Sequence, residues 1–181
     1  PEASPPVRAC IADLERAYAE NGAAFRAEAL ALLEARGYEA HEGLQDPAKP
    51  KWSYADVDDS TLEVSRPTID RAVAAVRRTC GLQAAGISRL EPGAAIRPHT
   101  GPTNRRWTLH LGLVVDAADV DRLTLTVAGT ARAGAWVQGK VVLFDDSYEH
   151  DVVHAGARDR VVLDLSVDHP SFFLRGDRGE L

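Results

Sequence analysis

The chain has 181 residues, 45% of them hydrophobic and 27% charged, which is typical of a globular protein with its own core. Its net charge of -6 argues against the positive field with which proteins attract nucleic acids or anionic membranes. No stretch approaches the roughly 18 apolar residues of a membrane-spanning helix, and the Pro-rich N-terminus lacks the apolar segment of a signal peptide. These features predict a single cytoplasmic domain spanning residues 1–181.

The first part of the chain, residues 1–81, predicts a helical support region. Apolar residues recur at helical spacing over 7–36, and Asn21-Gly22 divides this stretch into two consecutive helices. Residues 41–60 are rich in Pro, Asp, Lys and Gly and predict a loop with a short strand near 52–57. Pro67 is then suited to open a further helix, which ends near residue 80.

The two cysteines, Cys10 and Cys80, do not belong to a C-x-x-C pair or to any other metal-binding spacing. Reduced, buried thiols are the usual state of such cysteines in a cytosolic protein. We therefore expect two free thiols, since nothing in the sequence requires a disulfide between them.

The character of the sequence changes after residue 81, where short strand-like runs alternate with Gly- and Pro-containing turns. We expect strands near 84–91, 106–115, 122–127, 131–137, 139–144, 148–154 and 159–167. Helices followed by many short strands favour a sandwich or barrel with the helices packed outside it. The β core is expected to span 82–170, followed by a tail over 171–181 that is frayed from Arg175 onward.

Two of these strands carry an apolar face and a polar face. The apolar residues are Leu109, Leu111, Leu113 and Val115 in one strand, and Val161, Leu163, Leu165 and Val167 in the other. The polar residues are Arg106, Thr108 and His110 in the first, and Arg160, Asp164 and Ser166 in the second. Such a polar face can line either the solvent or a wet ligand cavity, and the alternation alone does not decide between them.

Two histidines are candidate metal ligands. His99 lies in the rigid segment Pro98-His99-Thr100-Gly101-Pro102, and His150 follows the turn Asp145-Asp146-Ser147. Histidines on neighbouring strands of a barrel can meet at one metal, and imidazole suits iron, zinc and copper alike. Asp145 and Asp146 are candidates for ligands or for acceptors that orient the histidines. Each motif alone is equally compatible with a surface histidine or an ordinary turn.

Arg160 is a candidate anion-binding residue on the strand that follows His150. A guanidinium can bind a carboxylate through two parallel hydrogen bonds, as a dicarboxylate co-substrate would require. An exposed strand arginine is the alternative.

Taken together, these segments resemble the aspartyl/asparaginyl β-hydroxylase family of Fe(II)/2-oxoglutarate-dependent oxygenases over roughly half of the chain. The residues that carry the resemblance are Ser88, Pro92-Gly93, Pro98-His99-Thr100-Gly101-Pro102-Thr103-Asn104, His110-Leu111-Gly112-Leu113, Gly139-Lys140, Phe144-Asp145-Asp146-Ser147-Tyr148-Glu149-His150, Arg160 and His169-Pro170. The resemblance implies a double-stranded β-helix, a jelly-roll and cupin-like core, with the N-terminal helices outside.

The resemblance also implies the roles of individual residues. It makes His99 and His150 the iron ligands, and Arg160, supported by Ser88 and His110, the partner of the distal carboxylate of 2-oxoglutarate. Arg106 matches a position that contacts a substrate carboxylate. The implied activity is hydroxylation of an amino-acid side chain, free, carrier-bound or in a short peptide, with Fe(II), 2-oxoglutarate and O2, in bacterial biosynthesis. The expected partner is a small molecule or short peptide, not nucleic acid or membrane.

Two positions depart from common patterns. Most oxygenases of the wider superfamily place a carboxylate ligand two residues after the first histidine, where this chain has Gly101, as does the family it resembles. The family's Arg-x-Arg-x-His motif reads Arg106-Trp107-Thr108-Leu109-His110 here. Thr108 thus puts a strictly aspartyl substrate in doubt, and Arg97 is the candidate to replace the missing charge.

Two other functions are compatible with the candidate site. A non-catalytic metal- or ligand-binding barrel is the main alternative, and a metal hydrolase would need Asp145 or Glu149 as a third ligand.

His154 lies four residues after His150, about 13 Å along a strand, so we expect a pocket or surface residue rather than a ligand. For His169 we expect a structural or orienting role.

Overall fold

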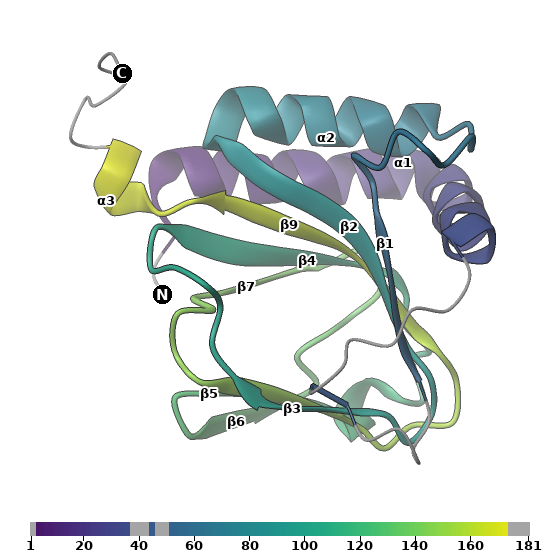
Figure 1. Cartoon of the computed structure of the whole chain (residues 1–181), viewed down its shortest axis with the longest axis vertical. Coiled ribbons are helices and arrows are strands. Elements are labelled where there is room, and N and C mark those ends of the chain that lie inside the picture. Colours follow the sequence, from purple (N-terminus) through teal and green to yellow (C-terminus); the bar gives the residue numbers. More distant parts are fainter. Residues whose placement is uncertain (1–2, 37–43, 46–50, 174–181) are drawn as a thin grey trace.

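In the computed structural model, which describes residues 3–36, 44–45 and 51–173, two β-sheets face each other and two helices cover the outer face of the larger sheet (Figure 1). The helices are α1 (Pro5–Arg36), α2 (Pro67–Cys80), the 3-10 turn η1 (Val120–Arg122) and α3 (Pro170–Phe173). The strands are β1 (Trp52–Asp56), β2 (Leu82–Leu90), β3 (Ala95–His99), β4 (Arg106–Val114), β5 (Leu123–Val127), β6 (Thr130–Ala133), β7 (Val141–Phe144), β8 (His150–His154) and β9 (Arg160–Asp168).

The order of the strands is that of a jelly roll. The larger sheet runs β1-β2-β9-β4-β7 and the smaller one runs β3-β8-β5-β6, with every pair antiparallel. Strands from the end of the chain thus lie between strands from its middle, in both sheets. The predicted double-stranded β-helix core with helices packed outside is confirmed.

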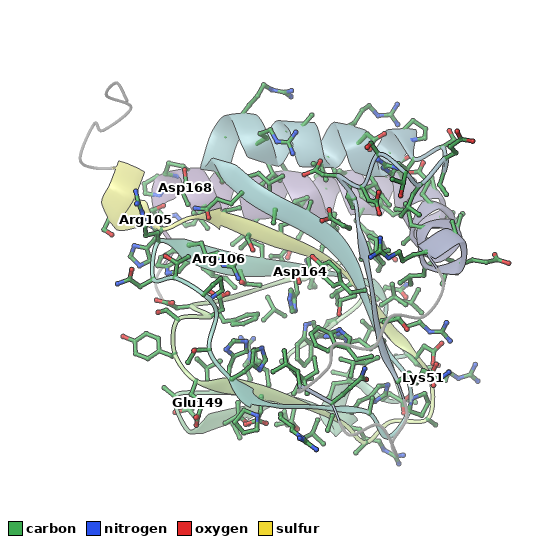
Figure 2. All side chains as sticks on the ribbon, in the orientation of Figure 1. Lys51, Arg105, Arg106, Glu149, Asp164 and Asp168 are labelled. Atoms are coloured by element: carbon green, nitrogen blue, oxygen red, sulfur yellow. A yellow bond between two sulfur atoms is a disulfide. The ribbon has the colours of Figure 1, made fainter. Side chains whose placement is uncertain are left out.

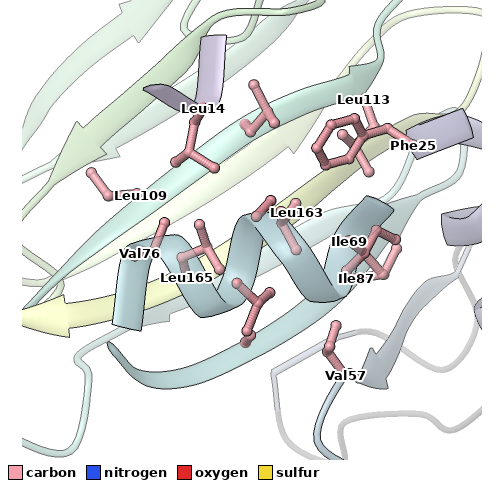
Figure 3. Packing of buried hydrophobic residues seen from close by; sticks show 14 of the residues in the cluster. Leu14, Phe25, Val57, Ile69, Val76, Ile87, Leu109, Leu113, Leu163 and Leu165 are labelled. Carbon is pink, nitrogen blue, oxygen red and sulfur yellow. The ribbon is translucent and has the colours of Figure 1, made fainter. Parts of the chain in front are cut away.

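The outer face of the larger sheet packs against both helices (Figure 3). Leu109 and Leu113 of β4 and Leu163 and Leu165 of β9 are fully buried there. Their helical partners in the same cluster include Leu14, Phe25, Ile69 and Val76. The predicted alternation is therefore confirmed, except at Val115, which joins the cluster between the sheets. A register shift between Gly112 and Val114 reverses the alternation before that residue.

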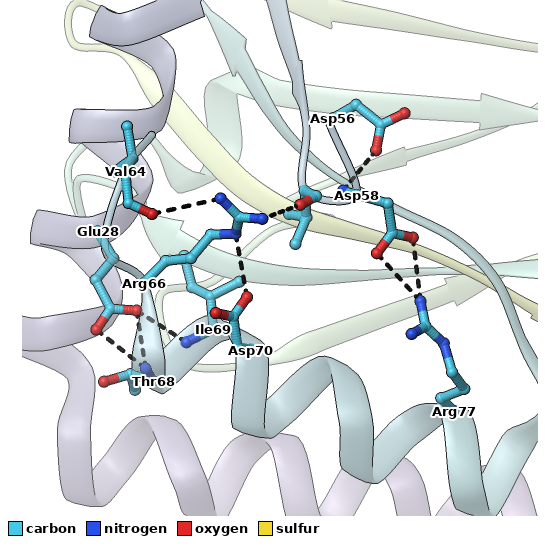
Figure 4. Close-up of polar contacts among 10 residues, drawn as sticks. Glu28, Asp56, Asp58, Val64, Arg66, Thr68, Ile69, Asp70 and Arg77 are labelled. Atoms are coloured by element: carbon cyan, nitrogen blue, oxygen red, sulfur yellow. Dashed lines mark hydrogen bonds and ion pairs between the residues drawn. The ribbon is translucent and has the colours of Figure 1, made fainter. Parts of the chain in front are cut away.

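Glu28 of α1 fixes the start of α2 (Figure 4). Its carboxylate accepts hydrogen bonds from the backbone N–H groups of Thr68, at 3.0 and 3.1 Å, and Ile69, at 2.9 Å. These donors lack partners within the helix, and a carboxylate there complements the helix dipole. Arg66, just before α2, donates to the carbonyl oxygen of Val57 at 2.6 Å, which ties the helix to the segment after β1.

A disulfide between Cys10 and Cys80 joins the first turns of α1 to the last residue of α2. The prediction of two reduced thiols was therefore wrong. The helices run antiparallel, since Glu28 meets the start of α2 while Cys10 meets its end. This docking brings together two cysteines that are 70 residues apart, and neither local spacing nor composition encodes it.

Several boundaries differ from the predictions. One predicted boundary is confirmed: α1 is divided by a kink at Asn21, whose φ of -131° and ψ of 21° are not helical. The expected strand 131–137 is shortened because the chain turns at Gly134, which has a positive φ of 69°. The strand β3 was not predicted, and it contains Pro98, which has no N–H to donate. Residues 41–43 and 46–50 of the predicted loop and 174–181 of the predicted tail lie outside the described residues.

Within the described part of the chain, no helix combines the length and apolar character needed to cross a lipid bilayer.

Candidate active site

A cavity of about 340 Å³ lies between the two sheets. It is lined by residues to which the family resemblance gives a role, namely Ser88, His99, Arg106, His110, His150 and Arg160. The polar faces of β4 and β9 therefore line a cavity rather than the outer surface. His99 and His150 lie on the small-sheet side of the cavity, and Arg106, His110 and Arg160 lie on the large-sheet side.

His99 and His150 are direct neighbours across the β3–β8 ladder, and their ring centroids lie 4.2 Å apart. Nδ1 of His99 lies 2.8 Å from the carbonyl oxygen of Arg97, and Nδ1 of His150 lies 3.0 Å from that of Tyr148. A carbonyl can only accept, so each Nδ1 carries a proton, and in the neutral ring Nε2 then keeps its lone pair. This arrangement, with Nδ1–H held by a backbone carbonyl, is typical of metal-binding histidines.

The local environment keeps His150 neutral. Burial lowers the pKa of its imidazole, against an opposing hydrogen bond to the Tyr148 carbonyl, and the neighbouring His99 lowers it further. Neutral imidazole is the form that binds a metal. The donor set therefore fits a divalent metal that accepts nitrogen ligands, such as Fe(II).

A carboxylate from another loop lies beside Gly101. A Cβ atom at Gly101 would be only 2.3 Å from Oδ2 of Asp146, and the Gly101 N–H donates to the Asp146 carbonyl at 2.6 Å. Oδ2 of Asp146 accepts from Arg106 Nη2 at 2.8 Å and Nε at 3.1 Å. Its Oδ1 is buried and has no hydrogen-bond partner among the described residues. Asp146 thus fills the space where a side chain at position 101 would lie.

The two other carboxylates near His150 do not complete a metal site. Asp145 accepts hydrogen bonds from the Ser147 backbone at 3.0 Å and hydroxyl at 2.7 Å, and Glu149 is exposed. Among residues 3–36, 44–45 and 51–173, no group of three or more His, Cys, Asp or Glu side chains is placed to hold a metal ion. The described residues thus offer no third protein ligand of the kind that a metal hydrolase would need.

Arg160 is 1% exposed and forms the charged end of the cavity. Its Nη2 donates to the hydroxyl of Ser88 at 3.1 Å, and its guanidinium lies 4.8 Å from the ring centre of Trp136. Nε and Nη1 have no hydrogen-bond partner within the described residues. Burial lowers the pKa of Arg160 to about 9, partly offset by the charge of Asp164. A buried cation with open donors is a site for an anion.

His110 is fixed by its neighbours on both sides. Trp136 donates its indole N–H to Nδ1 of His110 at 3.1 Å, while Nε2 lies 3.5 Å from Oδ1 of Asp164. Because Nδ1 accepts, Nε2 of the neutral ring carries the proton and can donate into the cavity. Trp136 was not singled out in the sequence, since a tryptophan in a turn-rich segment has no motif to mark it.

The remaining candidates lie apart from this cluster. The side chain of Arg97 is exposed and does not line the cavity, and only its carbonyl contributes, through His99. His154 is buried, with Nε2 2.7 Å from the Arg158 carbonyl and Nδ1 accepting from the Gly156 N–H at 3.1 Å. The expectation of a pocket or surface residue was wrong there, because both ring nitrogens hold the β8–β9 turn.

His169 contacts the C-terminal end of the fold. Its ring packs edge-on against Trp107, with centroids 4.9 Å apart, and its Nδ1 lies 2.7 Å from the Ser171 hydroxyl. Two cavity residues, Trp52 and Tyr54, were not identified as site residues from the sequence. Only their alternation on the predicted short strand near 52–57 could have suggested a shared face.

Comparisons with known proteins agree with this geometry. The family model described as Aspartyl/Asparaginyl beta-hydroxylase matches residues 19–170. The chain is 40% identical over 83 residues to the mouse aspartyl/asparaginyl beta-hydroxylase, covering 46% of this chain and 10% of that protein. It is 40% identical over 90 residues to the ornithine lipid ester-linked acyl 2-hydroxylase of Rhizobium tropici, covering 50% of this chain and 31% of that one. The chain therefore spans only a minor part of each relative.

A solved structure supports the same fold. The non-heme alpha ketoglutarate dependent epimerase SnoN from nogalamycin biosynthesis superposes with a TM-score of 0.60 at 16% identity, covering 88% of this chain and 82% of that one. At this identity the likeness concerns the fold alone. The match over residues 19–170 settles the relationship: the chain belongs to the aspartyl/asparaginyl β-hydroxylase family.

Proposed function

We propose that the protein is a Fe(II)/2-oxoglutarate-dependent hydroxylase that acts on an amino-acid side chain, free, carrier-bound or in a short peptide. The observation that carries this proposal is the pairing of two features in one cavity. His99 and His150 present two Nε2 lone pairs, and Arg160 presents unpartnered buried donors. Metal ligands and an anion site together are what a chelating dicarboxylate needs.

The residues of the chain would divide the work as follows. His99 and His150 hold the iron, which supplies the activation of O2 when it is bound. Arg160 and the Ser88 hydroxyl bind the distal carboxylate of 2-oxoglutarate, and His110 offers its Nε2–H to the same region. Asp146 offers a buried acceptor beside Gly101, while its ion pair with Arg106 keeps that acceptor in place. Phe144, Ile96 and Val152 line the cavity with apolar surface that limits the access of water.

The disulfide bears on the cellular compartment in which the protein works. A cytoplasmic location was expected from the sequence, but the Cys10–Cys80 disulfide is a feature of oxidising environments. The proposed activity does not depend on this point, because both sulfur atoms lie between the helices, away from the residues that line the cavity.

The proposal is tested by succinate formation and by ligand binding. The purified chain with Fe(II), ascorbate and O2 should convert 2-oxoglutarate to succinate, and under anaerobic conditions the iron-loaded chain should bind 2-oxoglutarate in a calorimeter. Arg160→Met should weaken that binding on the order of 100-fold, since removing one partner of a buried charged contact costs about 2–5 kcal/mol. Arg97→Met, which changes an exposed arginine, is the matched control.

Binding of iron without any binding of 2-oxoglutarate would instead favour a non-catalytic metal-binding barrel.

A further inference from the structure

Asp164 of β9 is a charged residue on the large-sheet side of the cavity, on the same strand as Arg160. Its side chain is 24% exposed and lines the cavity, and its register partners are Gly86 of β2 and His110 of β4. Figure 2 shows Asp164 and Arg106 on the side of the large sheet that faces the small sheet. The nearest basic group, Nε2 of His110, is 3.5 Å away.

His110 cannot neutralise this carboxylate. Its Nδ1 accepts the indole N–H of Trp136 at 3.1 Å, so that nitrogen has no proton of its own. The ring is therefore the neutral tautomer with hydrogen on Nε2, and Asp164 faces a dipole rather than a cation. The charge of the carboxylate remains unbalanced at this contact.

The two arginines of the cavity are committed elsewhere. Arg106 makes a two-nitrogen ion pair with Asp146. Arg160 directs Nη2 to Ser88 and, under the proposed function, its open donors to the distal carboxylate of 2-oxoglutarate. Among the described residues, Asp164 makes no close ion pair with an arginine or lysine, and it attracts Arg160 only from beyond ion-pair distance. Such a group in a half-enclosed site favours a cationic ligand.

The surroundings of Asp164 are small and rich in hydroxyl groups. Thr108 and Ser166 are register partners, 5% and 7% exposed, and both line the cavity. Their hydroxyls make no hydrogen bond within the part of the chain that the structure describes. Position 108 lies one row along the strand face from His110, so a long cationic side chain there could have reached Asp164. Threonine instead leaves the carboxylate open to the cavity.

Gly86 is the neighbour of Asp164 on β2, and its lack of a side chain makes room for Tyr54. A Cβ at Gly86 would lie 2.1 Å from the hydroxyl oxygen of Tyr54, so the missing side chain lets the Tyr54 ring cross the sheet toward Asp164. Burial, and then the negative charge of Asp164, raise the pKa of Tyr54. The phenol therefore stays protonated and uncharged beside the carboxylate, and does not supply the missing cation.

We propose that Asp164, with the hydroxyls of Thr108 and Ser166, binds a cationic nitrogen group of the substrate, an ammonium or a guanidinium. The inference rests on the proposed function, because the charge of Arg160 is matched by 2-oxoglutarate only if that co-substrate binds. It deepens that function by naming a substrate class: an amino acid or short peptide with a positively charged group, rather than an acidic one.

The experiment is anaerobic calorimetry on the full chain loaded with Fe(II) and 2-oxoglutarate. The probes are L-arginine, L-ornithine, L-citrulline, Nα-acetyl-L-arginine and L-aspartate. We expect a cationic probe to bind about 10–100-fold more tightly than L-citrulline or L-aspartate, as is usual for a hydrogen bond to a charged group. L-Citrulline keeps the α-ammonium and lacks only the side-chain charge, so this preference assigns the bound cation to the side chain. Nα-acetyl-L-arginine, which keeps only the side-chain cation, should then bind as L-arginine does.

In the chain saturated with Fe(II) and 2-oxoglutarate, Asp164→Asn should remove this preference, measured as the ratio of the affinities for L-arginine and L-citrulline. Asp168→Asn is the matched control, because it makes the same change on the same strand, outside the cavity, where Asp168 accepts from Gln83 at 2.7 Å. The inference is overturned if no cationic probe binds, if L-aspartate binds best, or if Asp164→Asn keeps the preference. Failure of the proposed function is recognised separately, because the iron-loaded chain would then not bind 2-oxoglutarate in the first titration.

Discussion

On β9, Leu163 and Leu165 point toward the helices, whereas Arg160 and Asp164 point into the cavity. The outer face of the large sheet is apolar and closed by α1 and α2, and the inner face is polar and partly open. Both faces are built from alternate residues of the same strands. The comparison shows that stability and ligand binding are assigned to opposite sides of one sheet, so substitutions on the two sides should have separable effects.

The largest effect is expected on the cavity side, at the small sheet. His150→Ala removes one of two nitrogen ligands, and we expect the affinity for Fe(II) to fall by more than about 100-fold, beyond the 10–100-fold seen for the partners of metal ligands. Titration of iron into the apo chain under anaerobic conditions measures this. Val153→Ala, at an exposed position of the same strand, should bind iron as the unchanged chain does; equal affinity in both variants would contradict the ligand assignment.

The next largest effect lies on the helix side. Leu165→Ala leaves a cavity in a fully buried cluster, and should lower the free energy of unfolding by about 2.7–5.0 kcal/mol. The affinity for 2-oxoglutarate should not change, because the side chain does not reach the cavity. Urea unfolding and calorimetry on the same variant test both statements. A large loss of 2-oxoglutarate affinity in the folded variant would mean that the two faces are coupled.

The disulfide allows a third test, because it lies among the helices and should affect stability alone. Reducing the Cys10–Cys80 bond should lower the free energy of unfolding by about 2–4 kcal/mol, because the unfolded chain regains the freedom of a long closed loop. Urea unfolding with and without reductant measures the change. A Cys10→Ala/Cys80→Ala variant should not respond to reductant, which separates the disulfide from other effects of the reagent.

The smallest effect has the opposite sign. Arg160→Met should raise the stability of the ligand-free chain by about 1 kcal/mol, since it removes a buried cation with open donors. Burial lowers the pKa of Arg160 to about 9, below its value in the unfolded chain, so folding holds this proton less tightly. The penalty is fully present below that pH and fades only as the pH rises above it, so thermal unfolding at neutral pH measures all of it. A variant less stable than the parent would show that the guanidinium contributes to the fold.

The sequence was sufficient for features that depend on local pattern. The alternation in 106–113 and 159–167 predicted which face of each strand is apolar, because side chains on a strand point alternately to its two sides. It failed at Val115, where a register shift reverses the parity. A shift of this kind depends on the partner strand, so one strand's sequence does not reveal it.

The candidate site could be predicted only in part for the same reason. His99 and His150 were found from their motifs and from the family resemblance. The position of Asp146 beside Gly101 was not, because it arises when β3 and β8 pair and bring two loops together. The disulfide was missed because it depends on how the two helices dock. Trp136 and Asp164 hold His110 from different strands or turns, and no spacing along the chain marks that contact.

Among the described strands, β3 lies at the edge of the small sheet beside β8, with an irregular register between Ile96 and His99, and the Arg97 N–H donates to the Leu44 carbonyl at 2.8 Å. At the C-terminal end of β3, His99 is the register partner of His150 in β8. An ion held by the two imidazoles would therefore link the end of β3 to β8 across the sheet. Amide hydrogen exchange near 97–101 should then slow when the metal binds, so the exchange rate of this strand end would report the metal content of the protein.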